Sequence, residues 1–230
     1  MGHQVPEQCG FEDTGERKVP GTSSVAALFS PAYRRDTIGL WLAFLFSLGS
    51  IYLVFGWLPS MLTSQGLDIG FASQGLTFYN LGGLLGVLSW AVLLTRFGSR
   101  GPLLFGAVGA GVAALLVLAV PVADSTQALM LAAIALNGLL ANAVQTALYA
   151  VASHAYPTSV RVTGIGYAAG LGRAGGILSS TFGAGLIGFG PGAYWGAIAL
   201  CMTVVFAGIA MVPHHFQRRT EEKTTEQSAA

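Results

Sequence analysis

The 230-residue chain is 53% hydrophobic and only 9% charged, with a formal net charge of +1 at pH 7. Soluble domains carry roughly 25% charged residues, and a soluble chain of this size could not cover its surface with so few. Nine of the 21 charged residues lie in 1–36, six in 213–230, and six in the 176 residues between. The composition predicts an integral membrane protein in a lipid bilayer. The lack of a central basic cluster argues against a nucleic-acid partner.

Six apolar stretches lie between a polar N-terminal arm at 1–36 and a polar tail at 213–230. Each is long enough to cross a hydrocarbon core about 30 Å thick, which takes about 20 helical residues. The links between them are short, so consecutive helices are expected to be antiparallel neighbours. The predicted spans cover about 37–62, 71–95, 102–122, 127–152, 163–188 and 192–212.

The positive charges outside the spans predict the orientation. Ten Lys and Arg residues lie before span one or after spans two, four and six, whereas the links 63–70, 123–126 and 189–191 contain none. An even number of spans places all ten on one side, and an excess of positive charge marks the cytoplasmic side. Both termini are therefore expected in the cytoplasm.

Arg173 is the one formal charge in the middle of a predicted span. It lies about ten residues into span five, roughly 15 Å along the helix, where an arginine costs at least about 2.5–3.5 kcal/mol. No predicted span contains Asp or Glu, so the countercharge is expected from another protein segment or an anionic ligand. A structural arginine that bonds helix-end carbonyls or a cavity water is the alternative.

The residues around Arg173 on a helical wheel are mostly glycines. They predict space beside the guanidinium, and the pairs Gly166/Gly170 and Gly172/Gly176 predict close approach of a neighbouring helix.

Other polar residues within the spans are candidates for a cavity lining. Asn142, Gln145 and Tyr149 share one face of span four, which predicts a polar interior or hydrogen bonds to other helices. Asn80 is the best such candidate in span two. Asn137 falls on a different face of span four and is expected to mediate helix packing.

No catalytic centre, cofactor site or metal site is predicted, so the chain is not expected to be an enzyme. His154 directly follows Ser153, which makes their side chains diverge on a helix, and no acid is placed to orient the imidazole. The other three histidines lie in the tails, without converging metal ligands. Near the outer end of span one, Trp57 and Pro59 predict an interfacial anchor and a helix break.

Three stretches of the sequence resemble the major facilitator superfamily. Residues 82–100, GGLLGVLSWAVLLTRFGSR, resemble the loop motif that this superfamily repeats in each half. Residues 156–176, YPTSVRVTGIGYAAGLGRAGG, resemble the segment around the eleventh helix of its aromatic-acid:proton symporters. Residues 28–44, LFSPAYRRDTIGLWLAF, resemble that family's passage from the central loop to the seventh helix. The resemblance covers about residues 25–213.

The resemblance implies an all-α integral membrane fold, a six-helix bundle that forms one half of the major facilitator fold as two inverted three-helix repeats. It implies part of a secondary transporter in the bacterial inner membrane that moves small organic anions, here aromatic carboxylates, by proton symport. In that interpretation Arg173 pairs with the carboxylate, and neutral hydrogen bonds come from Asn142, Gln145, Tyr149 and Asn80. The partner would be an N-terminal six-helix half, which would also carry the proton-binding group.

The loop motifs imply a cytoplasmic gate that involves Arg96, Gly98, Arg100 and Arg161. Thr95 stands where the family's motif has an acid, which weakens the expected lock of that gate. Two alternatives remain open at this point. One is a self-sufficient six-span channel or half-size carrier that acts as a homodimer, and the other is a non-functional truncated fragment.

Overall fold

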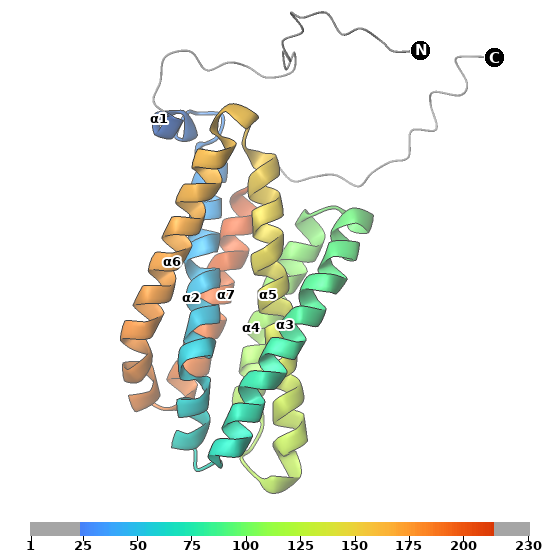
Figure 1. Cartoon of the computed structure of the whole chain (residues 1–230), viewed down its shortest axis with the longest axis vertical. Helices are drawn as coiled ribbons and strands as arrows, with labels where there is room; N and C mark the ends of the chain where they lie inside the picture. The colour runs from blue at the N-terminus through green and yellow to red at the C-terminus, as the bar shows by residue number, and fades with distance from the viewer. Residues whose placement is uncertain (1–23, 214–230) are drawn as a thin grey trace, which may run out of the picture.

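In the computed structural model, which describes residues 24–213, the chain forms helices joined by short turns (Figure 1). No β-strand occurs within these residues, and the predicted all-α class is confirmed. Most of the predicted arm at 1–36 and of the tail at 213–230 lies outside the described residues. The helices are α1 (Ser24–Leu28), α2 (Arg34–Ser64), α3 (Ile69–Phe97), α4 (Arg100–Ala119), η1 (Asp124–Thr126), α5 (Gln127–Ala155), α6 (Thr158–Gly188) and α7 (Pro191–Met211).

Five helical segments have the length and apolar composition needed to cross a membrane: α2, α3, α4, α7 and Asp124–Ala155, which joins η1 to α5. Helix α6 is not among them, because its nine glycines and Arg173 make it less apolar. It is nevertheless 31 residues long, about 46 Å at 1.5 Å per residue, and it packs along α2 (Figure 1). The described chain is thus a bundle of six long helices.

The six helices form two layers. One contains α6, α2, α5 and α3 in that order, and α7 and α4 lie behind it (Figure 1). The most extensive pairs are α2 with α6 and α3 with α5, and the two central helices also pack on the second layer, α2 on α7 and α5 on α4. The same pattern occurs twice if α2, α3 and α4 of the unit α2–α4 are matched with α5, α6 and α7 of the unit α5–α7: α2 with α6 corresponds to α5 with α3, and α2 with α7 corresponds to α5 with α4. Because each unit has three helices, the second starts at the opposite end of the bundle, as in inverted repeats.

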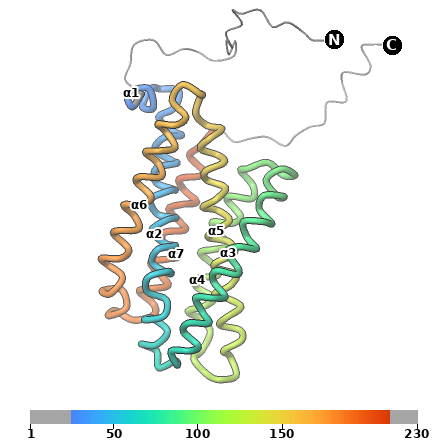
Figure 2. The backbone as a smooth tube through the Cα atoms, viewed as in Figure 1, coloured from blue at the N-terminus to red at the C-terminus, as the bar shows by residue number. Residues whose placement is uncertain are grey.

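The start of α2 and the end of α7 lie at the same end of the bundle (Figure 2). The arm predicted at 1–36 ends earlier than expected, because α2 begins at Arg34. Asp36 consequently lies in the first turn of α2, where it is fully buried. A carboxylate at this position interacts favourably with the positive end of the helix dipole.

Glycines set the distance between the paired helices. A Cβ atom on any of three glycines at the α3–α5 contact would meet the main chain of the facing helix: Gly82, Gly86 and Gly138. At the α2–α6 contact, a Cβ on Gly175 would meet the carbonyl oxygen of Leu45. Helices in a bilayer associate mainly by packing, since lipid tails are as apolar as their side chains. Close main-chain contact therefore holds the four-helix layer together.

One prediction about α6 is only half right. Gly172 and Gly176 do admit a neighbour, and Cβ atoms there would meet the side chains of Leu48 and Tyr52 on α2. Gly166 and Gly170 were expected to do the same, but no atom lies within 4 Å of their Cβ positions. They lie on a side of α6 that no described helix covers.

The predicted helix break at Pro59 is wrong, because α2 continues through this residue to Ser64. A proline removes one main-chain hydrogen bond from a helix, and membrane proteins tolerate that loss where neighbouring groups compensate. Leu58 and Met61 are both fully buried on either side of the proline.

We expect Gly86→Ala to lower the melting temperature of the purified protein, because the new methyl group would collide with the main chain of α5. Overpacking of this kind costs about 1–3 kcal/mol. Gly170→Ala is the matched control, because it places the same methyl group in open space, where alanine favours the helix. The measurement is thermal unfolding of both variants in detergent. Equal melting temperatures would contradict the role of glycine at the α3–α5 contact.

Candidate functional site

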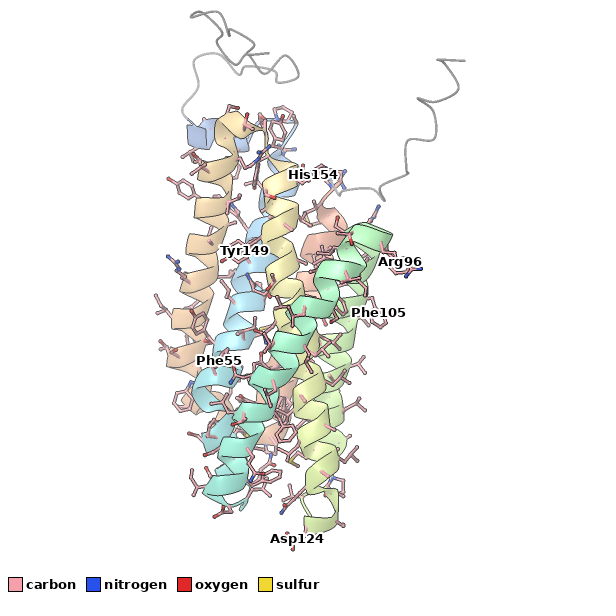
Figure 3. The ribbon with its side chains drawn as sticks, turned by 45° about the vertical axis from the view of Figure 1, so that its right-hand side comes forward. Phe55, Arg96, Phe105, Asp124, Tyr149 and His154 are labelled. Atoms are coloured by element: carbon pink, nitrogen blue, oxygen red, sulfur yellow. The ribbon has the colours of Figure 1, made fainter. Side chains whose placement is uncertain are left out.

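Aromatic side chains are exposed on the outer side of the four-helix layer. Other helices cover the remaining sides of α2 and α5, so exposed residues in their middles lie on this side. Phe55 and Tyr149 are each 40% exposed, and Figure 3 shows them at different heights of the bundle. Phe55 packs edge-on against Tyr79, with ring centroids 5.7 Å apart, and Tyr149 packs edge-on against Phe44 at 4.8 Å. We call the surface formed by Phe55, Asn142 and Tyr149 the open face.

The three polar residues predicted on one face of α5 differ in their surroundings. Tyr149 is exposed, Asn142 is half-buried, and Gln145 is only 7% exposed. The Asn142 amide donates to the carbonyl oxygen of Gly138 in its own helix at 2.9 Å, and its side chain lies over Gly83 of α3. Neither the nitrogen nor the oxygen of the Gln145 amide has a hydrogen-bond partner among the described residues. Tyr149 and Asn142 are therefore accessible from the open face, and Gln145 lies beneath it.

On α3, the predicted site residue Asn80 and its neighbour Tyr79 differ in their surroundings. Asn80 is exposed, and its amide donates to the carbonyl oxygen of Leu76 in the same helix at 2.8 Å. Its neighbour Tyr79 is fully buried, and its hydroxyl faces the Asn142 side chain without a well-aligned hydrogen bond. The signal that could have found Tyr79 is Gly82, because a residue three positions earlier on a helix shares the glycine's packed face.

Asn137 behaves as the sequence predicts. It is buried, and its amide nitrogen donates to the carbonyl oxygen of Ala110 on α4 at 2.8 Å. The hydrogen bond crosses between two helices. The predicted role of Asn137 in helix packing is confirmed.

Arg173 stands at the midpoint of α6, and its side chain is exposed. Its neighbours Gly172 and Gly175 are buried against α2, so the guanidinium extends from another side of the helix. It forms no hydrogen bond or ion pair with the described residues. Helix α2 separates α6 from α5 in the layer (Figure 1). The structure therefore does not bring Arg173 into hydrogen-bonding contact with the polar residues of α5.

A hollow of about 550 Å³ lies on α6 one turn before Arg173. It exists because Gly166 and Gly170, which have no side chains, form part of its floor. The ring of Tyr167 borders it and stacks on Trp41 of α2, with centroids 6.1 Å apart. The lining residues are Thr163, Gly166, Tyr167, Gly170 and Leu171.

The predicted loop motif between α3 and α4 forms a tight turn. Gly98 ends α3 with φ 77° and ψ −177°, a conformation that is essentially restricted to glycine. The guanidinium of Arg96 lies 5.9 Å from the centre of the Phe97 ring, and Figure 3 shows Arg96 at this end of the bundle. Arg100 begins α4 and is exposed. Both arginines are thus displayed at the end of the bundle where α2 begins.

The second motif organises the turn between α5 and α6. Arg161 Nε donates to the carbonyl oxygen of Tyr156 at 3.1 Å, and the Tyr156 ring occupies the space that a side chain at Gly164 would need. The Tyr156 hydroxyl donates to Thr37 Oγ1 at 3.3 Å, and Thr37 Oγ1 donates to the carbonyl oxygen of Leu28 at 2.8 Å. This chain of hydrogen bonds ties α1, α2 and the α5–α6 turn together.

The phenol of Tyr156 stays protonated at physiological pH. Burial raises its pKa, the hydrogen bond with Thr37 opposes the shift, and the carboxylate of Asp36 adds to it. The protonated hydroxyl can therefore donate to Thr37. The sequence offers no hint of this contact, because the two residues are 119 positions apart.

The family model described as Major Facilitator Superfamily matches residues 40–230. The chain belongs to this superfamily. Its match includes the α3–α4 loop motif, the α5–α6 turn and all of α6. The two-layer bundle with its repeated three-helix units is the architecture expected for one half of the superfamily's fold.

Several relatives are transporters of aromatic acids. The chain is 32% identical to the gallate transporter of Pseudomonas putida over 79% of this chain and 39% of that protein. It is 29% identical to the 4-hydroxybenzoate transporter PcaK of Pseudomonas aeruginosa, over 81% and 41%. It is 28% identical to the 3-(3-hydroxy-phenyl)propionate transporter of Escherichia coli, over 90% and 49%. The chain thus spans less than half the length of these relatives, and the predicted resemblance to aromatic-acid transporters is confirmed.

Proposed function

We propose that this chain forms one half of a secondary transporter that carries small aromatic carboxylates with protons across the bacterial inner membrane. Arg173 is the observation that supports this most directly. It stands at the midpoint of a long helix, exposed, with no ion pair to the described residues. A lone arginine at this depth of a bilayer is costly, and its planar fork suits a carboxylate.

The open face supplies the remaining chemistry of the proposed site. The rings of Phe55 and Tyr149 are apolar surfaces on which an aromatic ring can pack. Asn142 presents a neutral amide and Tyr149 adds a hydroxyl. The proposed site also includes the exposed amide of Asn80 on α3. Gln145 can contribute only from beneath this surface, because it is buried. Relatives named for gallate and 4-hydroxybenzoate support a ring-bearing acid as the cargo.

We assign the proton-binding group to a second six-helix half. The acids within residues 24–213 are Asp36, Asp68 and Asp124, and all three lie at helix ends. Asp68 accepts a hydrogen bond from the main-chain nitrogen of Gly70 at 2.7 Å, and Asp124 accepts one from Gln127 at 3.0 Å. The Asp68 contact caps α3, and the Asp124 contact joins two side chains at the start of η1 and α5. None of the three is in the middle of a long helix, where the proposed cargo would bind.

In the proposed orientation, the end that carries Arg96, Arg100 and Arg161 faces the cytoplasm. These arginines and Gly98 would then form this half's part of the cytoplasmic gate. A reporter fused after Phe189 is expected to report the outside, because the turn between α6 and α7 lies at the other end of the bundle (Figure 1). One fused after Arg100 should report the cytoplasm. A cytoplasmic signal at Phe189 would exclude this orientation.

The chain alone is not expected to accumulate 4-hydroxybenzoate in proteoliposomes, because the open face would lack its covering half. Co-expression with an N-terminal six-helix half from the gallate transporter should restore uptake, and a protonophore should abolish it. Empty vesicles are the control. Uptake by the purified chain alone would favour a homodimeric carrier. If the restored uptake is unchanged by the protonophore, proton coupling is refuted.

In the restored transporter, we expect Arg173→Gln to weaken binding of labelled 4-hydroxybenzoate more than Arg173→Lys does. Loss of a buried, hydrogen-bonded charge partner costs about 2–5 kcal/mol, which is about thirty-fold or more in affinity. Lysine keeps the charge and loses only the planar fork. Binding is measured per folded protein, with the uncharged 4-hydroxybenzamide as the control ligand. Unchanged affinity for the acid in Arg173→Gln would end this assignment.

A further inference from the structure

Several buried polar side chains depart from the pattern of the others, and Ser50 of α2, whose hydroxyl also lacks a partner within residues 24–213, is one of them. Many hydroxyl groups on the long helices donate to a carbonyl oxygen four residues earlier in the same helix. Ser47 of α2 and Gln145 of α5 do not, since Ser47 Oγ and both amide atoms of Gln145 lack a partner within residues 24–213. Ser47 is 0% and Gln145 7% exposed. The hydroxyls that follow the usual pattern belong to Thr63, Ser73, Thr77, Ser89, Thr181 and Thr203.

Ser47 and Gln145 lie at the same height of the α2–α5 contact. Phe44 of α2 touches Tyr149 of α5, and the two helices run antiparallel. Ser47 follows Phe44 by one turn of α2, and Gln145 precedes Tyr149 by one turn of α5. Because the helices run in opposite directions, both steps lead the same way along the bundle. The two unpaired groups thus belong to one small region between the central helices of the layer.

Leaving these groups unpaired is unfavourable. A buried polar group without a hydrogen bond costs about 1–3 kcal/mol, and a bilayer offers no water to compensate. The amide of Gln145 could make up to four hydrogen bonds. A leucine at this position would remove that cost, so the amide is expected to bind something outside residues 24–213.

We propose that Ser47 and Gln145 form a binding site for one neutral hydroxyl group. The amide oxygen of Gln145 would accept the hydroxyl proton, and the amide nitrogen and Ser47 Oγ would donate to the hydroxyl oxygen. A charged ligand is disfavoured, because no ionised side chain stands at this contact and a buried charge without a partner is costly. Asn142 and Tyr149 lie about one turn away on either side along α5, so the proposed site lies beneath the open face.

The hydroxyl has two sources, water or the ring hydroxyl of an aromatic acid. The second source rests on the proposed function, and the first does not. In the second case this contact would favour hydroxylated acids over unsubstituted ones. Thiol labelling and ligand-induced stabilisation distinguish the two sources.

The first experiment introduces Ser47→Cys or Gln145→Cys into the full chain after both native cysteines have been replaced. A maleimide reacts with the thiolate, which forms only where water reaches the sulfur. Val144→Cys is the control, because Val144 is fully buried next to Gln145 and faces Gly106 of α4. Faster labelling at positions 47 and 145 than at position 144 identifies water as the bound hydroxyl.

The second experiment compares the melting temperature of the purified chain with 4-hydroxybenzoate and with benzoate. If the cysteines at positions 47 and 145 are not labelled, water does not reach the site. In that case 4-hydroxybenzoate should raise the melting temperature of the chain by a few degrees more than benzoate does. Gln145→Leu should abolish this difference. Asn137→Leu is the matched control: its amide already bonds Ala110, so this variant should melt earlier and still distinguish the acids.

The results separate this inference from the proposed function. Labelled cysteines with no response to either acid would leave the hydroxyl site standing and count against aromatic-acid binding. Unlabelled cysteines with an equal response to both acids would overturn the hydroxyl site and leave the proposed function standing. Unlabelled cysteines with no response to either acid, or a Gln145→Leu variant that keeps the difference, would also overturn the site.

Discussion

The close main-chain contact between paired helices is the constraint on which the rest of this structure depends. In water, burial of apolar surface would bring these helices together, but lipid is as apolar as their side chains. Gly82, Gly86 and Gly138 let α3 and α5 touch through their backbones, and Gly175 does the same for α6 and α2. These two pairs determine which sides of α2 and α5 are covered. They therefore also determine which side is left as the open face.

Polar groups take three different positions in this bundle. At the end where α2 begins, the hydrogen bonds from Tyr156 through Thr37 to Leu28 join segments that are distant in the sequence. Along the helices, most hydroxyls and the amides of Asn80 and Asn142 bond to their own helix. Other groups, including Arg173, Gln145, Ser47 and Ser50, form no side-chain hydrogen bond with the described residues. The proposed function rests on Arg173, and the hydroxyl site rests on Gln145 and Ser47.

The positions of Arg173 and Gln145 also suggest how a ring-bearing acid would lie across the layer. Arg173 belongs to α6 and Gln145 to α5, and α2 lies between these two helices (Figure 1). A carboxylate bound by Arg173 would direct the ring of the proposed cargo toward α2. The opposite end of the acid would then lie above Ser47 and Gln145. A carrier that binds both ends of its cargo would thus use Arg173 and Gln145 of the unit α5–α7 together with Ser47 of the unit α2–α4.

Composition and spacing by themselves determined the membrane class, the six helices and the cation at the middle of α6, because apolar length and charge depend on neither packing nor partners. The loop glycine Gly98 and the packing role of Asn137 could also be read in this way. The burial of Tyr79 beside the exposed Asn80, the uninterrupted helix at Pro59 and the exposed pair Gly166/Gly170 were decided only by the tertiary structure. Adjacent residues on a helix point about 100° apart, and a sequence cannot tell which of them a neighbour will cover. Contacts between residues far apart in the chain determine which helices become neighbours. These contacts bury Gln145 and leave Arg173 exposed.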